Sequence, residues 1–394
     1  MKIYEIATGY TSIPATISAA TEIVIEQLTT AMISNGKDVE IIDIRDKNRK
    51  DTNLKIDEVA VPSFLTSTDT SLGIIHKLKR VIYSISLAGK LKKILKKTND
   101  KVVFHFHNQY NMFFFLKLTG KKEREKCIMA YTNHSGIWSL EWDEVEPTLK
   151  KRYFQEWECQ QNADILYILN DDTKANVINH LGVDENKIVR INNGVNTDMY
   201  RPLSLQEKEA IKADYGVTGK KIILQVGSVY DNKGQDRAIK YLTQLMKEDP
   251  DLMYLYAGGI VDEEYHNSIK KYVADNGLDA QVKYLGMLSP GEELNRVYNM
   301  ADATISLSKY EAFSLVVVES YSAGVPMLID ESNKSVFSIG AVLYNKDNFE
   351  SKVKDIIFGD KENYQQLSDS VRNIATNNYS WAAIAKNYTD SWEK

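Results

Sequence analysis

The chain has little cysteine and no long apolar run, and both absences narrow what it can be. Only two of its 394 residues are cysteines, Cys127 and Cys159, so a disulfide framework is excluded and no CxxC pair offers a zinc knuckle. No stretch approaches the ~20 consecutive apolar residues that a membrane-spanning helix needs. The opening residues, MKIYEIATGY, lack the pattern of a secretory signal. We therefore expect a cytoplasmic protein.

The chain also lacks an excess of positive charge. Its formal net charge is −5, which gives no reason to expect nucleic acid as a partner. Hydrophobic residues make up 43% of the 394 positions, enough apolar material for two ordinary cores.

Strand patterns and helix patterns alternate along the chain, which predicts parallel sheets covered by helices on both faces. The fold class is therefore α/β, with two Rossmann-like, doubly wound domains facing a central cleft. We expect the domains to span 1–198 and 199–394, because VNTDMYRPLS (195–204) interrupts the alternation. A last helix, about 380–394, is a candidate to pack back on the first domain. The predicted strands lie at 1–8, 38–44, 101–107, 126–134, 163–170, 187–194, 220–228, 252–259, 281–286, 302–308 and 325–330, and helices at 20–36, 236–248, 265–277 and 290–301.

One stretch carries the strongest chemical signal, YEAFSLVVVESYSAGVPMLI at 310–329. We predict a helix that begins near Ser314, and the first amides of a helix have no intrahelical acceptor and attract anions. A diphosphate at these amides would leave Glu311 to bond sugar hydroxyls and Glu319 to accept both ribose hydroxyls. The alternative is a buried helix whose glutamates merely mark its surface.

The surrounding motifs resemble those of the family-4 glycosyltransferases, retaining enzymes with the GT-B fold. EAFSLVVVE matches their E-x7-E motif, and SYSAGVPMLI matches the segment that follows it. Further matches occur in order and spacing at INNGVNTDMYRP, LQVGSVYDNKGQDRAIKYL, LYAGG and VKYLGMLSPGEELNRVYNMADATISLS. The resemblance covers nearly the whole chain and is strongest over 220–329.

The resemblance implies a nucleotide diphosphate sugar as donor and a role for each matching residue. Glu311, His134 and Lys233 would be the catalytic residues, with Lys233 neutralising the diphosphate and His134 near the reacting sugar. It implies no cofactor and no metal. His105 and His107 share one face of a strand, but no third ligand lies at a convincing spacing. The implied donor-binding residues are Ala19, Ala20, Gly227, Ser228, Lys233, Glu311, Phe313, Ser314, Leu315, Val316 and Glu319.

Three features depart from the family pattern. Ser228 stands where many relatives have an arginine, and Ala19 and Ala20 stand where relatives have paired glycines. The segment ESNKSVFSIGAVLY (331–344) is shorter than the glycine-rich loop of relatives. These departures keep two alternatives open, namely a catalytically weakened partner that binds the acceptor and a nucleotide-sugar epimerase on the same fold.

Residues 74–97, IIHKLKRVIYSISLAGKLKKILKK, combine apolar positions with eight lysines and arginines and no acidic residue. This basic amphipathic pattern suits an anionic membrane surface. It also suits a helix on the sheet whose outer face is solvated. With the family resemblance, the first option predicts a peripheral enzyme on the inner face of the membrane. Such an enzyme would transfer sugar to a glycan or lipid-linked acceptor during cell-surface polysaccharide synthesis.

Overall fold

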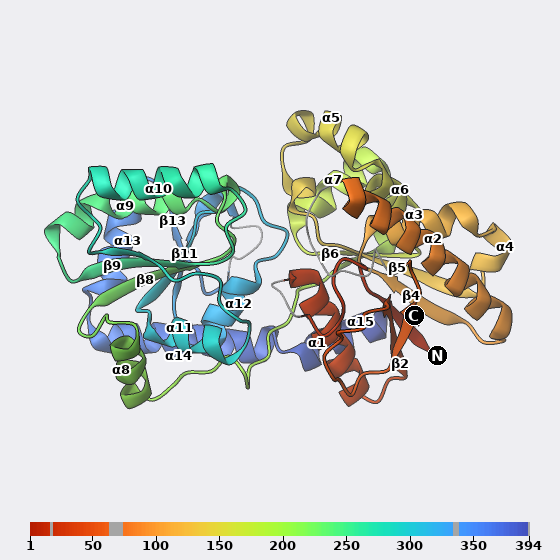
Figure 1. Ribbon diagram of the computed structural model, residues 1–394, viewed down its shortest axis with the longest axis horizontal. Coiled ribbons are helices and arrows are strands. Elements are labelled where there is room, and N and C mark those ends of the chain that lie inside the picture. The colour runs from red at the N-terminus through yellow and green to blue at the C-terminus, as the bar shows by residue number, and fades with distance from the viewer. Residues whose placement is uncertain (16–18, 63–73, 334–338, 393–394) are drawn as a thin grey trace. The chain divides into compact units, whose positions relative to one another are not determined.

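The structure is a computed structural model that describes residues 1–15, 19–62, 74–333 and 339–392 (Figure 1). For 74–76 only the backbone is described. The chain forms two compact units, one from Met1–Gly194 with Trp381–Lys394 and the other from Val195–Ser380. The division after Gly194 lies four residues before the predicted boundary at 198.

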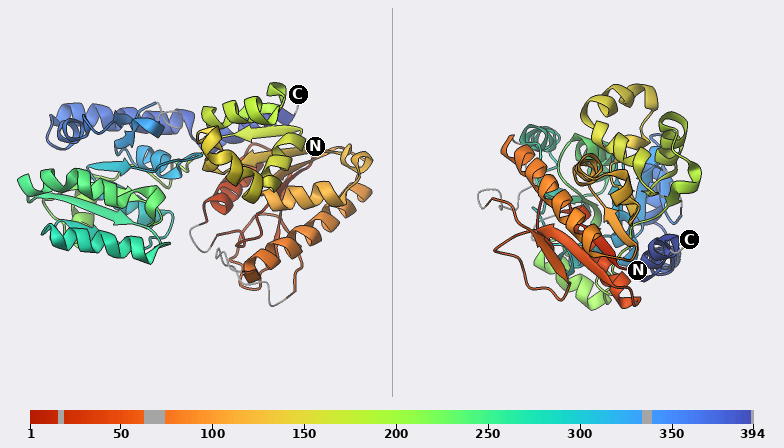
Figure 2. Two further views of the ribbon diagram at one scale, coloured as in Figure 1. Left: turned by 90° about the horizontal axis from the view of Figure 1, so that it is seen from above. Right: turned by 90° about the vertical axis from the view of Figure 1, so that its right-hand side faces the viewer.

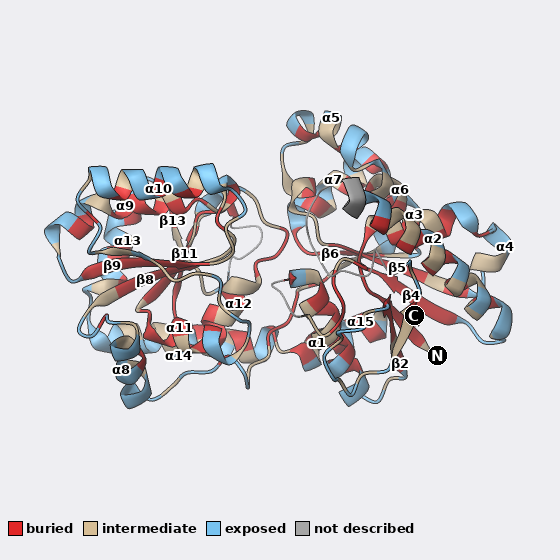
Figure 3. Ribbon diagram, in the orientation of Figure 1, coloured by how far each residue is buried: buried red, intermediate tan, exposed pale blue. Residues whose placement is uncertain are grey.

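The first unit contains a seven-stranded parallel sheet in the order β3-β2-β1-β4-β5-β6-β7. Its inner strands are fully or largely buried because helices cover both faces, as Figures 2 and 3 show, whereas the edge strands are only partly buried. The strands are β1 (Ile3–Ile6), β2 (Val39–Ile44), β3 (Ile56–Val59), β4 (Val102–Phe106), β5 (Cys127–Asn133), β6 (Ile165–Ile168) and β7 (Ile188–Arg190). The helices are α1 (Ala20–Ser34), α2 (Ile74–Lys97), α3 (Gln109–Leu118), α4 (Lys121–Arg124), α5 (Trp142–Arg152), α6 (Phe154–Asn162), α7 (Asp171–Leu181) and α15 (Trp381–Trp392).

The second unit contains a six-stranded parallel sheet in the order β10-β9-β8-β11-β12-β13. Its helices bury one apolar face each, as in α9, where Ala238, Leu242 and Leu245 lie in the core. The strands are β8 (Lys221–Val226), β9 (Leu252–Ala257), β10 (Val282–Tyr284), β11 (Ala303–Ser306), β12 (Met327–Asp330) and β13 (Val342–Tyr344). The helices are α8 (Leu205–Asp214), α9 (Gln235–Glu248), α10 (Glu263–Asp275), α11 (Glu292–Met300), α12 (Leu315–Ser322), α13 (Phe349–Ile357) and α14 (Lys361–Asn378).

Each sheet has one switch point, which is the place where the strand order reverses. In the first unit the reversal lies between β1 and β4, and in the second between β8 and β11. Ligands of open α/β sheets bind outside the carboxyl ends of the strands at such a point. The loops after these four strands are therefore the places to look for a site.

The two segments that connect the units run side by side. The Val195 amide donates to the Tyr379 carbonyl oxygen at 2.7 Å. At Gly194 a Cβ atom would lie 2.5 Å from the ring of Trp381, so glycine leaves room for that ring. The predicted last helix, about 380–394, is α15, which belongs to the first unit and lies beside α1.

The parallel α/β fold is confirmed, and the predicted strands and helices form. Two edge strands, β3 and β13, have no counterpart among the predicted elements. The sequence IDEV carries two acidic residues between its apolar ends, and VLY lies in the segment 331–344 that departs from the family pattern.

Helix α2 divides its apolar residues between two faces. Tyr83, Leu87 and Leu91 are fully buried against the sheet, whereas Leu78 and Ile85 are 49% and 45% exposed. The helix therefore has a face in the core and a second face with lysines beside exposed leucine and isoleucine. Among the described residues, no helix combines the length and the apolar character that a membrane crossing requires.

Candidate active site

Helix α12 starts where the sequence predicts it, with Ser314 as its N-cap and Leu315 as its first residue. Its first turn contains no acidic residue, and the Ser314 side chain makes no capping hydrogen bond. Leu315 and Val316 are partly exposed, whereas the following valines are buried in the core of the unit. The start of α12 therefore presents backbone amides and the positive end of the helix dipole without a charge of its own to neutralise them.

An ion pair lies in the loops that follow β8 and β11. The Lys233 ammonium and the Glu311 carboxylate are in direct contact, although 78 positions separate them in the chain. Ser308 donates a hydrogen bond of 2.7 Å to the same carboxylate oxygen. Burial disfavours the ammonium, but the charge and hydrogen bond of Glu311 outweigh it and raise the pKa of Lys233. A permanent cation thus lies next to a carboxylate at the switch point of the sheet.

Hydrogen bonds fix both loops. Gln225, a polar residue inside the otherwise apolar strand β8, donates to the Lys233 carbonyl oxygen at 2.7 Å and accepts from the Tyr254 hydroxyl at 2.7 Å. The Asn232 carbonyl oxygen accepts from the Lys309 amide at 2.8 Å, which joins the Lys233 loop to the Glu311 loop. The two charged groups are therefore held on ordered backbone rather than on free surface loops.

A tight glycine turn follows β8. Gly258, at the end of β9, approaches so closely that a Cβ atom there would lie 2.0 Å from the Gly227 carbonyl oxygen. Ser228, in the arginine position of relatives, lies next in the chain and is partly exposed. Arg237 does not replace that arginine, because its guanidinium donates to the carbonyl oxygens of Leu307 at 2.7 Å and Asp231 at 3.1 Å. Its charge supports the loops instead.

Glu319 lies in the second turn of α12. Its carboxylate accepts a hydrogen bond of 2.9 Å from the Tyr298 hydroxyl, with Tyr200 beside it. Burial raises the pKa of Glu319 to about 7, although the two tyrosine hydroxyls act in the opposite direction. The carboxylate therefore gains much by accepting further hydrogen bonds from a ligand.

Most predicted donor-binding residues lie together in the second unit. The ring of Phe313 is buried and packs on Tyr379, with 6.0 Å between ring centroids, so its backbone is the part that a ligand could reach.

His134, Ala19 and Ala20 belong to the first unit. Ala19 is the buried N-cap of α1, and Ala20 is exposed. Part of the short segment 331–344 lies outside the described residues. The donor roles of all these residues and the cleft between domains stay predictions.

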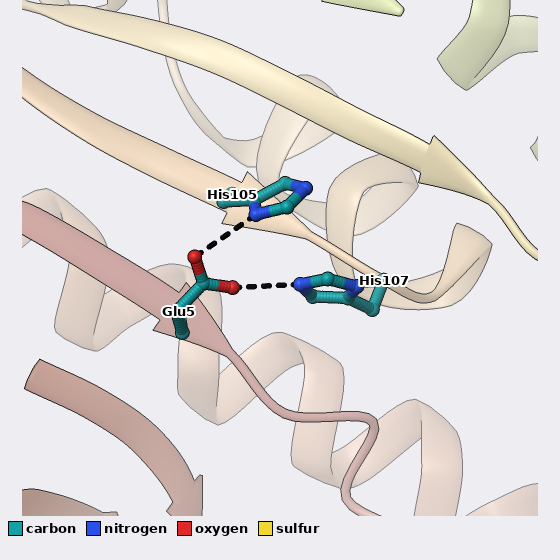
Figure 4. Close-up of side chains that lie close together, drawn as sticks. All are labelled: Glu5, His105 and His107. Atoms are coloured by element: carbon teal, nitrogen blue, oxygen red, sulfur yellow. Dashed lines mark hydrogen bonds and ion pairs between the residues drawn. The ribbon is translucent and has the colours of Figure 1, made fainter. Parts of the chain in front are cut away.

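The first unit has a polar cluster at its own switch point (Figure 4). Glu5 in β1 lies between His105 and His107 of the β4 segment, and its carboxylate bonds to both rings. No third group lies at a convincing spacing in the sequence, whereas the structure places Glu5 beside both histidines. Glu5 lies 100 positions before His105, so sequence spacing could not reveal it.

Several residues of both sites were not predicted from the sequence: Glu5, Tyr200, Gln225, Tyr298 and Ser308. Glu5 and Gln225 did leave a signal. Each is a polar residue within an apolar strand of a parallel sheet, where both faces are buried, so each needs a specific partner. The tyrosines and the serine leave none, because their relevance depends only on which loops meet.

Comparison with known families agrees with this architecture. Residues 21–199 match the model "Glycosyltransferase Family 4", and residues 207–387 match "Glycosyl transferases group 1". The spore coat protein SA of Bacillus subtilis is 23% identical over the full length of both chains. The D-inositol 3-phosphate glycosyltransferase of Corynebacterium aurimucosum is 28% identical over 46% of this chain and 44% of its own.

Solved structures show the same fold. The sucrose-phosphate synthase of Thermosynechococcus elongatus superposes with a TM-score of 0.76 at 19% identity, covering 100% of this chain and 98% of its own. The Anabaena protein HepE, solved with UDP and glucose, has a TM-score of 0.72 at 13% identity and covers 100% and 99%. With two family models that match nearly the whole chain, this protein belongs to the family-4 glycosyltransferases and has the GT-B fold.

Proposed function

We propose that the protein is a retaining, metal-independent hexosyltransferase that moves a sugar from a nucleotide diphosphate sugar to a hydroxyl group of a glycan or lipid-linked acceptor. One observation carries the proposal. The Lys233–Glu311 ion pair lies at the switch point of the second sheet, in the same loop region from which helix α12 starts.

Each part of the donor has a chemical counterpart in this region. The amides of Leu315 and Val316, together with Lys233, suit a diphosphate. Glu311 would accept hydrogen bonds from the sugar, and Glu319 would accept them from the ribose. The UDP in the HepE structure supports a nucleoside diphosphate as the leaving group.

The proposed reaction needs no protein nucleophile. The acceptor oxygen forms a bond to the anomeric carbon while the bond from that carbon to the phosphate oxygen breaks. The acceptor proton passes to the leaving phosphate, which departs from the same face and so retains the anomeric configuration. Lys233 stabilises the negative charge that develops on the diphosphate, the task that a metal ion performs in other enzymes.

The proposal about the acceptor is based on the first unit, which contains helix α2. The outer face of α2 combines lysines with exposed Leu78 and Ile85, which suits an anionic lipid surface. We therefore propose a cytoplasmic enzyme that lies on the inner face of the membrane and takes part in cell-surface polysaccharide synthesis.

One observation favours a second candidate. Ser228 leaves the glycine turn without the arginine of relatives, and Arg237 is engaged with carbonyl oxygens. Losing one such cation costs about 100-fold or more in rate. The protein would then be a weakened transferase that binds an acceptor for an active partner.

A panel of UDP-, ADP-, GDP- and dTDP-linked sugars tests the proposal, with and without lipid extract and oligosaccharides, and with EDTA. Acceptor-dependent release of nucleoside diphosphate that resists EDTA, retains the anomer by NMR and disappears in Glu311→Ala supports it. Glu292→Ala is the control, because Glu292 lies on α11 of the same unit with its side chain 57% exposed. Donor binding without turnover would favour the weakened partner, and an isomerised nucleotide sugar without acceptor would favour an epimerase.

A further inference from the structure

A buried carboxylate at the switch point of the first sheet is held by two histidines. Glu5 of β1 pairs in register with His105 of β4. Its two oxygens lie 3.0 Å from His105 Nδ1 and 2.7 Å from His107 Nε2 (Figure 4). Glu5 and His105 are completely buried, and His107 is 4% exposed. A charge in such a place must have a structural or chemical purpose, because its burial is costly.

The distances favour hydrogen bonds over a metal ion. A tetrahedral ion about 2.0–2.1 Å from each ligand keeps two ligand atoms about 3.3 Å apart. Glu5 and His107 are separated by only 2.7 Å, the distance of a charge-assisted hydrogen bond. His105 Nε2 is also bonded, to the Thr132 hydroxyl at 2.7 Å.

The hydrogen bonds continue from His107 to His134. His107 Nδ1 lies 2.9 Å from His134 Nε2. Burial alone would raise the pKa of Glu5, but its two histidines lower it to about 2, so the group is an ionised acceptor. Burial also lowers the pKa of His107 to about 4, which leaves that ring neutral with one proton.

These protonation states fix the position of each proton along the hydrogen bonds that run from Glu5 through His107 to His134. A carboxylate can only accept, so His107 Nε2 carries the proton and donates it. His107 Nδ1 is then bare and must accept, which requires the proton of His134 to be on Nε2. Burial, His107 and His105 lower the pKa of His134 well below its usual value, so this ring is neutral too and its Nδ1 keeps a lone pair.

The cluster is closed on one side and open on the other. Tyr388 and Trp392 of α15 cover His105, with ring centroids 5.2 and 5.8 Å away. His134 follows β5 at the same edge of the sheet and is partly exposed. Within the described part of the chain, no residue bonds to its Nδ1. A ligand can therefore reach this series of hydrogen bonds at His134.

We propose that Glu5 and His107 are positioning residues that lock His134 in the neutral form with its proton on Nε2, so that Nδ1 accepts a hydrogen bond from a sugar hydroxyl. The part of this inference that involves sugar rests on the proposed function, whereas the proton positions rest on the hydrogen bonds and on the protonation states of Glu5, His107 and His134.

Nitrogen NMR of the protein labelled with ¹⁵N-histidine tests the proton positions without any substrate. The chain has six histidines, so single His→Gln variants can assign the spectrum. We expect a single tautomer for His134, with Nε2 protonated and Nδ1 bare. In His107→Phe we expect both tautomers in exchange. A proton on Nδ1 of His134 in the unaltered protein, or no change in His107→Phe, overturns the proposal.

Kinetics test the positioning role. His107→Phe should lower kcat/KM by about 10- to 100-fold, the usual cost of a lost orienting partner. His105→Asn is the control, because the asparagine amide nitrogen takes the place of Nδ1 and can still donate to Glu5, so the path from Glu5 to His134 stays intact. Equal losses in both variants, or no loss in His107→Phe, overturn the role.

A second pair of variants covers the case in which the phenylalanine variant fails to fold. In Glu5→Gln the amide oxygen can still accept a hydrogen bond from His107. The NH₂ group can donate to Nδ1 of His105, and Nε2 of His105 can then donate to the Thr132 hydroxyl. We expect Glu5→Gln to keep the His134 tautomer and Glu5→Leu to lose it. If Glu5→Gln loses the tautomer as Glu5→Leu does, the proposal fails.

Two outcomes separate this proposal from others. One equivalent of a transition metal in the purified protein that is lost in Glu5→Gln would overturn it in favour of a metal site. If no nucleotide sugar is turned over, the proposed function fails and the sugar part of the inference with it, whereas a fixed His134 tautomer would still establish the proton positions.

Discussion

Replacing Lys233 by methionine separates what the ion pair does for stability from what the ammonium does for chemistry. The side chains of Lys233 and Glu311 are 23% and 15% exposed, so solvent screens the pair only in part. Methionine keeps the length and apolar stem of lysine and removes the charge. The Glu311 carboxylate then stays in the same place without its cation.

The structure sets the expected sizes of the two effects. Leaving a largely buried carboxylate without its charged partner costs about 1–3 kcal/mol of unfolding free energy. Loss of a cation at the leaving diphosphate costs about 2.7–4 kcal/mol of transition-state stabilisation, which is about 100- to 1000-fold in kcat. We expect the lower part of that range, because in the free protein the ammonium must first give up part of its contact with Glu311.

The double variant distinguishes the two roles. In Lys233→Met/Glu311→Gln the uncompensated charge is gone, so denaturant unfolding should show most of the lost stability restored. Its activity should stay as low as that of Lys233→Met or fall further, since restored stability brings back neither the ammonium nor the carboxylate.

Lys309→Met is the matched control. Lys309 lies two residues before Glu311 and pairs with Asp231, but the two side chains are 52% and 61% exposed. An exposed pair of this kind contributes about 0–1 kcal/mol, so both stability and turnover should change little. The assays are urea unfolding, calorimetric titration with nucleoside diphosphates and release of nucleoside diphosphate. Equal losses in Lys309→Met, or unchanged nucleotide binding and turnover in Lys233→Met, would refute the reasoning.

Three further predictions concern other parts of the two units. Because the pKa of Glu319 is about 7 when folded and about 4.3 when unfolded, its contribution to stability is present at low pH and is lost as pH rises from about 4.3 through 7. Urea unfolding at several pH values should show this loss in the unaltered protein but not in Glu319→Gln, and an identical profile in both would exclude the shift. Gly258→Ala should cost about 1–3 kcal/mol, because its Cβ would meet a carbonyl oxygen at 2.0 Å at a φ of +148°. Gly259→Ala, whose Cβ would lie 3.5 Å from a flexible methionine, should cost much less in the same thermal unfolding experiment. Finally, Leu78→Ser should weaken sedimentation with anionic vesicles without changing stability, and equal binding of the unaltered protein to anionic and neutral vesicles would refute the membrane face.

Much of the fold could be predicted because it depends on local patterns. The β4 sequence VVFHF and the β9 sequence LMYLYA can be buried on both faces only in a parallel sheet under helices. The start of α12 could be predicted because a run of apolar residues follows Ser314. The predicted motif residues of the second half, from Gly227 to Glu319, do lie in one unit. The strands β3 and β13 could not be found, because IDEV carries two acidic residues and VLY lies in the segment that departs from the family pattern.

The amino-acid sequence by itself determined the class of this protein: alternating strands and helices, two domains, and motifs that place it among the family-4 glycosyltransferases. Only the tertiary structure decided which distant groups meet. It brings Lys233 against Glu311, Gln225 under the lysine loop, and Glu5 between His105 and His107. The physical reason is that a periodic pattern reports which face of an element is buried, whereas hydrogen bonds between loops depend on strand order and register. In a parallel sheet neighbouring strands come from distant parts of the sequence, so those contacts exist only once the sheet has formed.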